Sequence, residues 1–505
     1  MQLASNTALH NLLSKSAASH PDATAILECC EKRTSYGELS DKSNEIAEHL
    51  NKFAIGKNRF IALLMQKNAD AIAAIFGILK SGNAYIPLSS ESPTTRLSEI
   101  IVDAKPSALI TDIAALDTVR NILGDGWSLI CVIGDSHALF QPSGMGDFAG
   151  ENTAYCLYTS GSSGRPKGVV HTHDSALAFI DWCSGEFSIC ASDRFSSCAP
   201  LHFDLSIFDI FLAIKHGASV ALFDADRIRK PSILADDLSR LEITIVYATP
   251  TLLRMLLNYG ALKPIYSPKL VCFAGEIFPT KQLNALMEFW PKTDFYNLYG
   301  PTETNVCAFH KVSKADLARD QVPIGRACSG DILRLCPTDA TNYNAIGELL
   351  VSGRSVMTSY WNAPSLTDGA FVHIDGKPWY KTGDIVEEIA PGEYKYIGRN
   401  DRMVKRRGYR IELNEIELAL SHNNRLLENA VVSTVSEDGA DVTLTCFFCA
   451  RKKISALEIR KHCANLISLY MVPDVFRQLD VLPKTSTDKI DYMRLKGLVH
   501  ALTNQ

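Results

Sequence analysis

The chain has 505 residues, which is too long for a single hydrophobic core, so two or more domains are expected. Its composition, 46% hydrophobic and 21% charged, is ordinary for a globular protein. The net charge of −5 and the lack of a long basic run argue against nucleic acid as a main partner.

Fourteen cysteines are scattered along the chain, many of them in apolar runs. Cys446 and Cys449, in TLTCFFCA, are typical of a buried strand, and no second pair of metal ligands follows them. The first residues lack the pattern of a signal peptide, and no apolar run reaches the length of a bilayer span. We therefore expect a reduced, cytoplasmic protein with no membrane partner.

In chain order, short apolar runs alternate with amphipathic segments of helix length. The run at 59–65 precedes a helical segment at 69–82, and further strand-like runs follow at 107–111, 218–223, 243–249 and 269–275. Strands that alternate with helices are typical of parallel sheets covered by helices. The first part of the chain is therefore expected to be α/β.

From about residue 345 the pattern changes to short strands and turns, such as GELLVSG, PWYKTGDIVEEIA and GEYKYIGRND. This pattern favours a small β-barrel or meander. After Asp401 a basic cluster, RMVKRRGYR, precedes a compact α+β pattern. We expect a domain boundary near 398–402.

The stretch YTSGSSGRPKGVVHTH (158–173) is rich in glycine and hydroxyl side chains and contains Lys167. Such a loop exposes backbone N–H groups to phosphate oxygens, and the lysine adds a positive charge. It is not a Walker A loop, because Pro166 precedes the lysine and Gly168, rather than Ser or Thr, follows it. The alternative is a surface turn between the strand AYCLY and the next helix.

Four further motifs follow in order. YGPTET supplies an aromatic ring at Tyr299 and a carboxylate at Glu303, which suit a base and a magnesium ion. YKTGD ends in Asp384, a possible acceptor for ribose hydroxyls, and Arg399 and Lys489 lie on later polar segments. Singly, each has a structural explanation: Tyr299 as core, Asp384 as a turn residue and Lys489 as a solvated lysine.

Together these motifs resemble those of the adenylate-forming superfamily, which contains acyl-CoA synthetases, luciferases and adenylation domains of nonribosomal peptide synthesis. TSYGELS (34–40) and LKSGNAYIPLSSESPTTRL (79–97) are similar to its early motifs. The resemblance implies an α/β with α+β fold. A large N-terminal domain (1–398) would hold two α/β sheets and a small β-barrel, followed by a hinge (399–402) and a small mobile C-terminal α+β domain (403–505).

The resemblance also implies an ATP-dependent ligase with Mg²⁺ as cofactor, in which positioning and cations lower the barrier to AMP transfer. Thr159 and Lys167 would hold the phosphates, Glu303 the metal, and Lys489 would bridge the carboxylate and the α-phosphate. The other nucleotide-binding positions would be Ser160, Gly161, Ser162, Ser163, Gly164, Ala274, Gly275, Glu276, Asn297, Tyr299, Gly300, Thr302, Asp384, Tyr396 and Arg399. Asp401 matches the hinge, where rotation would exchange Lys489 for the loop at 405–408.

Asp204, in APLHFDLSIFDIF, is a carboxylate in an apolar context and is costly to bury without a partner. It matches the aspartate that meets the α-ammonium of the substrate in amino-acid adenylation domains. The alternative role is an N-cap of the following helix. By resemblance, the substrate-binding positions are Phe203, Asp204, Leu205, Phe208, Tyr247, Cys272, Ala274, Leu298, Val306 and Cys307.

This wall is apolar or weakly polar, so it fits a small uncharged amino acid. The set is similar to that of freestanding L-proline-activating enzymes, and we expect L-proline as substrate. Because no carrier domain follows Lys489, the acceptor thiol is expected on a separate peptidyl carrier protein with phosphopantetheine, with coenzyme A as the alternative acceptor. The alternatives are a ligase for another small apolar amino acid, an acyl- or aryl-CoA ligase, which Asp204 opposes, and a nucleotide-binding protein without activity.

Overall fold

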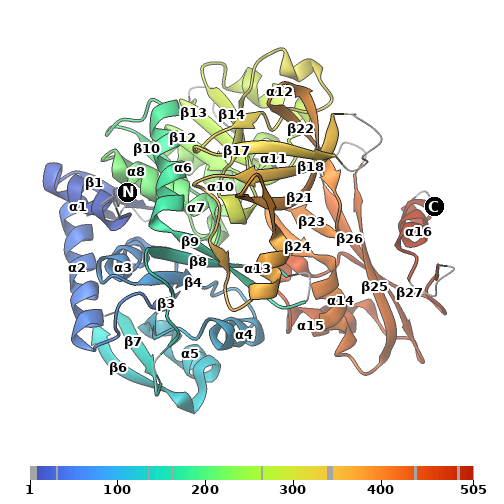
Figure 1. Ribbon diagram of the computed structural model, residues 1–505, viewed down its shortest axis with the longest axis horizontal. Coiled ribbons are helices and arrows are strands. Elements are labelled where there is room, and N and C mark those ends of the chain that lie inside the picture. The colour runs from blue at the N-terminus through green and yellow to red at the C-terminus, as the bar shows by residue number, and fades with distance from the viewer. Residues whose placement is uncertain are drawn as a thin grey trace. The chain divides into compact units, whose positions relative to one another are not determined.

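The computed structural model of the chain is shown in Figure 1. The structure describes residues 8–29, 32–134, 136–144, 146–161, 164–262, 266–337, 345–436, 441–485 and 490–503. The chain forms two compact units. The first comprises residues 1–90, 101–158 and 168–400, and the second comprises residues 91–100, 159–167 and 401–505.

A nine-stranded sheet is the largest element of the first unit. Strands β14, β13, β12, β10, β11 and β1 are parallel neighbours, and antiparallel strands flank them on both sides. In sheet order the strands are β16 (Arg326–Ala327), β15 (Ala308–Lys311), β14 (Asp294–Tyr299), β13 (Leu270–Ala274), β12 (Ile245–Ala248), β10 (Arg194–Ser197), β11 (Ser219–Leu222), β1 (Thr24–Glu28) and β2 (Arg33–Ser35).

An eight-stranded sheet is the second layer. Its strands, in order, are β19 (Ser359–Tyr360), β9 (Lys167–Thr172), β8 (Thr153–Thr159), β4 (Ala84–Pro87), β3 (Phe60–Leu64), β5 (Ala108–Asp112), β7 (His137–Pro142) and β6 (Trp127–Ile133). One hydrophobic core contains residues of both sheets and of α3 (Ala69–Lys80). Almost every residue of α3 is buried, as expected for a helix that is apolar on all sides.

Helices connect the strands of the first unit, so its predicted α/β class is confirmed. The longer helices are α1 (His10–Ser19), α2 (Tyr36–Lys52), α4 (Thr94–Ala104), α5 (Leu116–Leu123), α6 (His173–Glu186), α10 (Pro231–Arg240), α11 (Pro250–Tyr259), α12 (Thr280–Phe289) and α13 (Pro364–Ala370). Short helical turns are α7 (Leu205–Ile207), the π-helix η3 (Phe208–Leu212), α8 (Ala213–Lys215), α9 (Ala225–Ile228), η1 (Ile113–Ala115), η2 (Gly124–Gly126), η4 (Thr302–Thr304) and η5 (Asp316–Ala318).

The stretch predicted to form a small β-barrel or meander folds as a five-stranded antiparallel sheet. Its order is β17-β18-β21-β20, and β22 also pairs with β21. The strands are β17 (Ile332–Pro337), β18 (Ile346–Ser352), β20 (Phe371–Ile374), β21 (Lys377–Ala390) and β22 (Glu393–Arg399).

The second unit has the predicted α+β character. Its elements are the hairpin β23 (Met403–Arg406) and β24 (Tyr409–Glu412), the three-stranded sheet β25 (Leu426–Val435), β26 (Val442–Ala450) and β27 (Val475–Gln478), and the helices α14 (Leu413–Ser421), α15 (Ala456–Ala464), η6 (Leu469–Met471) and α16 (Tyr492–Thr503). Cys446 and Cys449 are buried in β26, which confirms that CFFC is a strand. All cysteines within the described residues are free thiols.

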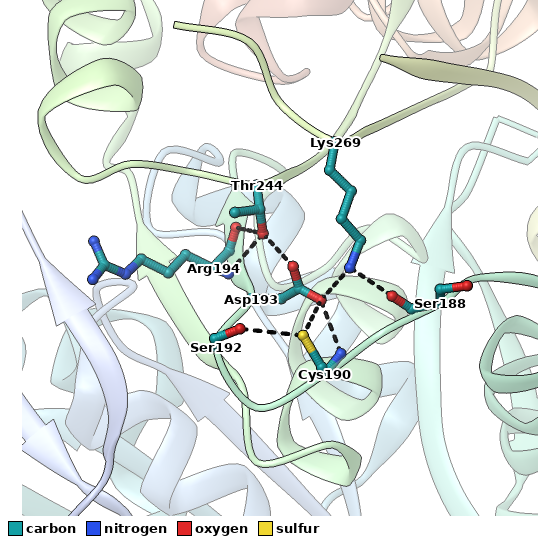
Figure 2. A network of polar contacts seen from close by, with 7 residues as sticks. All are labelled: Ser188, Cys190, Ser192, Asp193, Arg194, Thr244 and Lys269. Carbon is teal, nitrogen blue, oxygen red and sulfur yellow. Dashed lines mark hydrogen bonds and ion pairs between the residues drawn. The ribbon is translucent and has the colours of Figure 1, made fainter. Parts of the chain in front are cut away.

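Figure 2 shows a polar network at the amino ends of three parallel strands. Asp193 precedes β10, Thr244 precedes β12 and Lys269 precedes β13. The Asp193 carboxylate pairs with Lys269 Nζ at 2.6 Å and accepts the Thr244 hydroxyl at 2.8 Å. It also accepts the Cys190 N–H at 2.9 Å. One buried carboxylate therefore joins three neighbouring strands at their amino ends.

No helix in the described part of the chain is both long enough and apolar enough to cross a bilayer.

Candidate active site

Predicted site residues lie on, or directly after, the carboxyl ends of four adjacent parallel strands. The segment around Asp204 follows β10, Thr249 follows β12, Gly275 follows β13 and Gly300 follows β14. In open α/β sheets, ligands bind in the crevice beyond the carboxyl ends of the strands. The sheet therefore brings together segments that are separated by up to a hundred residues in the sequence (Figure 1).

Hydrogen bonds join these segments in pairs. Thr302 Oγ1, beyond β14, donates to Asp204 Oδ2, beyond β10, at 2.7 Å. The hydroxyl and the N–H of Thr251, beyond β12, donate to Glu276 Oε2, beyond β13, at 2.7 and 3.1 Å. The loops at the carboxyl ends of these strands are therefore bonded in two pairs, the loop after β14 to the loop after β10 and the loop after β12 to the loop after β13.

The side chain of Asp204 does not cap the helix that follows it. Asp204 has helical backbone angles, φ −62° and ψ −25°, and its carboxylate makes no cap hydrogen bond to α7. An N-cap residue has an extended backbone and accepts an N–H of the first turn, so the capping alternative is wrong. The carboxylate is half-buried and accepts the Thr302 hydroxyl instead.

Apart from Asp204, the predicted pocket residues lie in one hydrophobic core cluster, with Phe203 packed against it and Cys307 in a second cluster. Tyr247 and Cys272 are register partners on β12 and β13, and Ala274 and Leu298 are partners on β13 and β14. The Phe208 and Tyr247 rings are 4.9 Å apart. The remaining wall positions, Leu205 and Val306, are also buried.

The negative charge of Asp204 acts on the wall residue Tyr247. Burial, together with the negative charge of Asp204, raises the pKa of the Tyr247 phenol well above its ordinary value. The phenol is therefore a neutral group in an otherwise apolar wall. An apolar wall with the half-buried Asp204 carboxylate at its edge suits a small ligand that carries a positive charge at one end.

Tyr299, Asp384 and Arg399 meet at the end of β14. Tyr299 donates its hydroxyl to Asp384 Oδ2 at 2.5 Å, and Arg399 Nη1 pairs with the other carboxylate oxygen. Asp384 and Arg399 are register partners on β21 and β22. Asp384 has no exposed surface. The structure thus brings together three residues that the sequence assigned separately to adenine and ribose.

Glu303 lies in the single turn η4 and is fully buried. Its Oε1 accepts the Tyr360 hydroxyl at 2.6 Å. A buried carboxylate beside a threonine hydroxyl is a donor set that Mg²⁺ accepts, because it prefers oxygen ligands. Glu303 and Thr302 therefore have the chemistry that the predicted Mg²⁺ site requires.

The predicted phosphate loop does not lead directly into a helix. It joins two strands, β8 and β9, and helix α6 begins only at His173, because the β-branched run Val169–Val170 extends the second strand. In the second unit, Ser160 Oγ donates to the Arg410 carbonyl at 2.6 Å. The alternative placed this turn between the strand AYCLY and a helix, but the strand β9 comes before the helix, so that connection is wrong.

One hydroxyl of this loop has no partner. Thr159 Oγ1 is buried and makes no hydrogen bond within the described residues. The N–H of Gly161 donates to Glu415 Oε2 at 3.3 Å, so a carboxylate already occupies this backbone donor. Gly164 and Lys167, the other predicted phosphate-binding residues that the structure describes, also belong to the second unit. Ser162, Ser163 and Lys489 lie outside the described residues, and their roles stay predictions.

The other predicted nucleotide positions lie on β13, β14 and β22 or just beyond them. Asn297 Nδ2 donates to the Pro323 carbonyl at 2.8 Å, and Tyr396 packs against the cluster that contains Tyr299. Gly300 is in close contact with backbone: a Cβ there would lie 2.0 Å from the Asn305 carbonyl oxygen. Only glycine fits at this position.

Asp401, the predicted hinge, is the first residue of the long C-terminal segment of the second unit. Its Oδ1 accepts the Met403 N–H at 3.2 Å. Its role as a hinge stays a prediction.

The sequence interpretation missed two buried residues near η4. His171 Nε2 lies 2.8 Å from the Thr302 carbonyl oxygen, and Asn305 follows the turn. Burial lowers the pKa of His171 to about 4, although the Thr302 carbonyl and the Glu303 charge oppose this shift. The signal was in the quoted loop string, whose last residues are HTH, and in the asparagine after TET.

Lys67 is a third residue that the sequence interpretation missed. Its Nζ donates to the carbonyl oxygens of Ser197 at 2.6 Å and Ala199 at 3.0 Å, at the carboxyl end of β10. Burial lowers its pKa to about 8, although Cys198 and Asp209 favour the charged form. It holds the strand end from which the Asp204 segment departs.

Comparisons with known proteins show the family of the chain. Residues 13–361 match the family described as AMP-binding enzyme. The L-proline--[L-prolyl-carrier protein] ligase of Pseudomonas fluorescens is 34% identical over 96% of this chain and 98% of that protein. The ligase of the same name from Streptomyces coelicolor is 36% identical over 91% of each chain. Tyrocidine synthase 1 of Brevibacillus parabrevis is 30% identical over 97% of this chain and 45% of that protein.

Solved structures have the same fold. The adenylation domain AlmE of Vibrio cholerae, in complex with glycyl-adenosine-5'-phosphate, has a TM-score of 0.83 at 22% identity and covers 99% of both chains. The amide bond synthetase McbA of Marinactinospora thermotolerans has a TM-score of 0.83 at 19% identity, over 97% of this chain and 99% of that chain. These likenesses confirm the predicted fold class.

Proposed function

Because the chain belongs to the AMP-binding enzyme family, we propose that it activates L-proline with ATP and transfers the prolyl group to a carrier protein. The acceptor is the phosphopantetheine thiol of a separate peptidyl carrier protein. Two relatives that match over most of their length are named for this activity, which supports the choice of substrate and partner.

One observation carries the proposal: the carboxylate of Asp204 lies at the edge of an apolar wall and does not cap its helix. A half-buried carboxylate in such a place is stabilised by a cation. The α-ammonium of an amino acid supplies one, whereas a simple acyl or aryl acid does not. An apolar wall fits the ring of proline and offers no charged partner to a polar side chain.

In the first step, a carboxylate oxygen of the amino acid attacks the α-phosphorus of ATP. A new P–O bond forms, the bond to the β-phosphate oxygen breaks, and pyrophosphate leaves. Asp204 orients the ammonium, Tyr299 packs against adenine, and Asp384 with Arg399 holds the ribose. Lys167 and Thr159 bind the leaving phosphates, and Lys489 neutralises charge between the carboxylate and the α-phosphate.

Glu303 and Thr302 would hold Mg²⁺, which when bound offsets the negative charge of the phosphates. The chain itself contributes a fixed, buried carboxylate whose orientation is set by the Tyr360 hydroxyl. Because the Glu303 carboxylate is already held in one orientation, it loses little conformational freedom when the ion binds.

In the second step, the thiolate of the carrier attacks the carbonyl carbon of prolyl-AMP. A thioester bond forms and AMP leaves with its bonding electron pair. Rotation at Asp401 would remove Lys489 and admit the loop at 405–408 for this step.

The first test is amino-acid-dependent ATP–pyrophosphate exchange with L-proline, D-proline, pipecolate, alanine, valine and benzoate. We expect strong exchange with L-proline. Close analogues that differ by one methylene are discriminated by only about 1–3 kcal/mol, so weaker exchange with pipecolate is compatible. Equal exchange with benzoate would point to an acyl-CoA type of ligase, and no exchange with any acid would contradict the enzyme proposal.

Asp204→Ala tests the ammonium site. Loss of one partner of a buried charge pair costs about 2–5 kcal/mol, so kcat/KM for L-proline is expected to fall roughly a hundredfold or more, while ATP binding persists. Asp226→Ala removes an exposed aspartate from the same unit and is the matched control. Wild-type exchange in Asp204→Ala would remove the basis for amino-acid specificity.

A further inference from the structure

Four buried polar side chains lie behind the turn that carries Glu303, and the roles assigned above do not involve them. Tyr155 is on β8, His171 on β9, Ser175 on α6, and Asn305 directly follows η4. None is more than 4% exposed. Buried polar groups are costly unless they are hydrogen-bonded, so their arrangement has a physical cause.

The Thr302 carbonyl determines which imidazole nitrogen of His171 carries the proton. His171 Nε2 lies 2.8 Å from this oxygen, which can only accept a hydrogen bond. Nε2 is therefore the donor. In the neutral ring, Nδ1 is then an acceptor.

Asn305 supplies a donor to Nδ1. Its Nδ2 donates to His171 Nδ1 at 3.3 Å, and the Ser175 hydroxyl faces the same nitrogen at 3.0 Å. The hydroxyl of Tyr155 donates to Asn305 Oδ1 at 2.9 Å, which fixes the orientation of the amide. A single imidazole is thus bonded to the first residue of the turn and to the residue that follows its end.

The backbone of Asn305, at the end of the turn, is in an unfavourable conformation. Asn305 has φ 52° and ψ −106°. Such a conformation persists in a non-glycine residue only when the surrounding structure holds it. The two hydrogen bonds of the Asn305 amide hold the residue from the side of β8 and β9.

The turn carries both halves of the site. The Thr302 hydroxyl bonds the Asp204 carboxylate, and the next residue is Glu303. A shift of the turn therefore moves the hydroxyl beside the amino-acid site and the carboxylate of the Mg²⁺ site together.

We propose that His171 and Asn305 are positioning residues, in which one neutral imidazole bonds both ends of the 302–305 turn and fixes the Thr302 hydroxyl and the Glu303 carboxylate. Their hydrogen-bond partners are protein groups, and the proposed reaction assigns them no contact with the amino acid or the nucleotide. The assignment of Asp204 to the amino acid and Glu303 to Mg²⁺ rests on the proposed function, whereas the hydrogen-bond arrangement does not.

Two substitutions separate the two bonds of the ring. In His171→Gln the amide NH₂ reaches the place of Nε2 and keeps a donor for the Thr302 carbonyl. In His171→Asn the shorter amide replaces Nδ1 alone, and the bond to Thr302 is lost. We expect His171→Asn to lower kcat/KM in ATP–pyrophosphate exchange about ten- to a hundredfold, and His171→Gln to lie within about threefold of wild type, because small displacements at a site are costly.

His216→Asn is the matched control. His216 lies in the first unit, like His171, and its ring is also close to a serine hydroxyl, Ser184, at 2.9 Å, but it is half-buried whereas His171 is fully buried. Wild-type kinetics are expected for this variant. Binding of L-proline by calorimetry without ATP gives a readout apart from turnover, and it should weaken in His171→Asn alone. Equal effects of Asn and Gln at position 171, or no effect of either, would overturn the proposal.

The tautomer is measured independently of activity. Nitrogen-15 NMR of the ligand-free protein with labelled histidine, at one pH, should show His171 as the neutral Nε2–H tautomer, assigned by the loss of its signal in His171→Asn. An Nδ1–H tautomer or a charged ring would overturn the proposal. A wild-type protein that shows this tautomer but no amino-acid-dependent exchange would contradict the proposed function and leave the hydrogen-bond arrangement intact.

Discussion

At the scale of single residues, buried charges with several partners have the largest expected effects. Asp384 has no exposed surface and depends on Tyr299 and Arg399. His137, 8% exposed, lies between two carboxylates, with Nδ1 3.5 Å from Asp112 and Nε2 3.6 Å from Asp70. Both arrangements should be visible in stability as well as in activity.

Tyr299→Phe removes one donor from the buried Asp384 carboxylate and leaves the ring in place. We expect the free energy of unfolding to fall by about 1–3 kcal/mol, which is the usual cost of an unsatisfied buried group. Urea unfolding measures it. Tyr259→Phe, at a tyrosine that is 70% exposed, is the control and should be neutral. A neutral Tyr299→Phe would mean that water replaces the lost donor.

His137 should make stability depend on pH. The nearby carboxylates of Asp112 and Asp70 favour the charged imidazole and raise the pKa of His137 to about 9, above the value of about 6.5 in an unfolded chain. The stabilisation is therefore complete below pH ~6.5 and is lost as the pH rises towards 9. Urea midpoints at pH 6, 7.5 and 9 should show this decline in the wild type. His137→Gln should flatten it, and a decline of the same size in the variant would assign the dependence to other groups.

At the scale of elements, side-chain hydrogen bonds and ion pairs join the parallel strands of the nine-stranded sheet at both their amino and their carboxyl ends. The Asp193 network joins the amino ends of β10, β12 and β13, and the bonds of Asp204 and Glu276 join loops at the carboxyl ends. The first network joins the strands, and the second joins the loops that carry side chains of the proposed ligand site.

Asp193→Asn should destabilise the sheet. Burial opposes ionisation, but Lys269, the Cys190 N–H and the Thr244 hydroxyl together lower the pKa of Asp193 below its ordinary value. Its contribution is present above pH ~4 and is lost as the pH falls further. We expect a loss of about 1–3 kcal/mol at pH 7 in urea unfolding.

Asp294→Asn provides the comparison for Asp193→Asn. Asp294 pairs with Lys311 at 3.0 Å, but both side chains are more than half exposed. Exposed pairs contribute about 0–1 kcal/mol, so this variant should be close to wild type. Equal losses in the two variants would contradict a special role for the Asp193 network.

At the scale of the whole molecule, the division of the chain into two units bears on the two proposed half-reactions. The long C-terminal segment of the second unit begins at Asp401, directly after Asn400 of the first. Proline at position 401 fixes φ and removes an N–H, so it restricts any rotation there.

Asp401→Pro should therefore separate the two steps. ATP–pyrophosphate exchange is expected to stay near wild type, while prolyl transfer to the carrier slows by at least about tenfold, since hinge residues govern conformational steps. Single-turnover formation of the carrier thioester measures the second step. Asp401→Asn keeps an acceptor for the Met403 N–H and should retain both activities. Loss of exchange and transfer to the same extent would contradict a hinge at this position.

The sequence was sufficient for features that depend on local pattern. Alternating strands and helices predicted the α/β class, and the runs at 59–65, 243–249 and 269–275 became β3, β12 and β13. The unusual composition of the loop at 158–173 and its downstream motifs indicated the family. These features can be predicted from the sequence because hydrophobic periodicity and loop conformation depend on residues that are neighbours in the chain.

The tertiary structure decided which partners those residues meet. It showed that Asp204 bonds Thr302 rather than capping its helix, and it revealed the imidazole that bonds both ends of the 302–305 turn. The sequence interpretation could not see these contacts, because His171 and Asn305 are 134 positions apart and come together only when the two sheets pack. A hydrogen bond depends on distance in space, and a single sequence records distance along the chain alone.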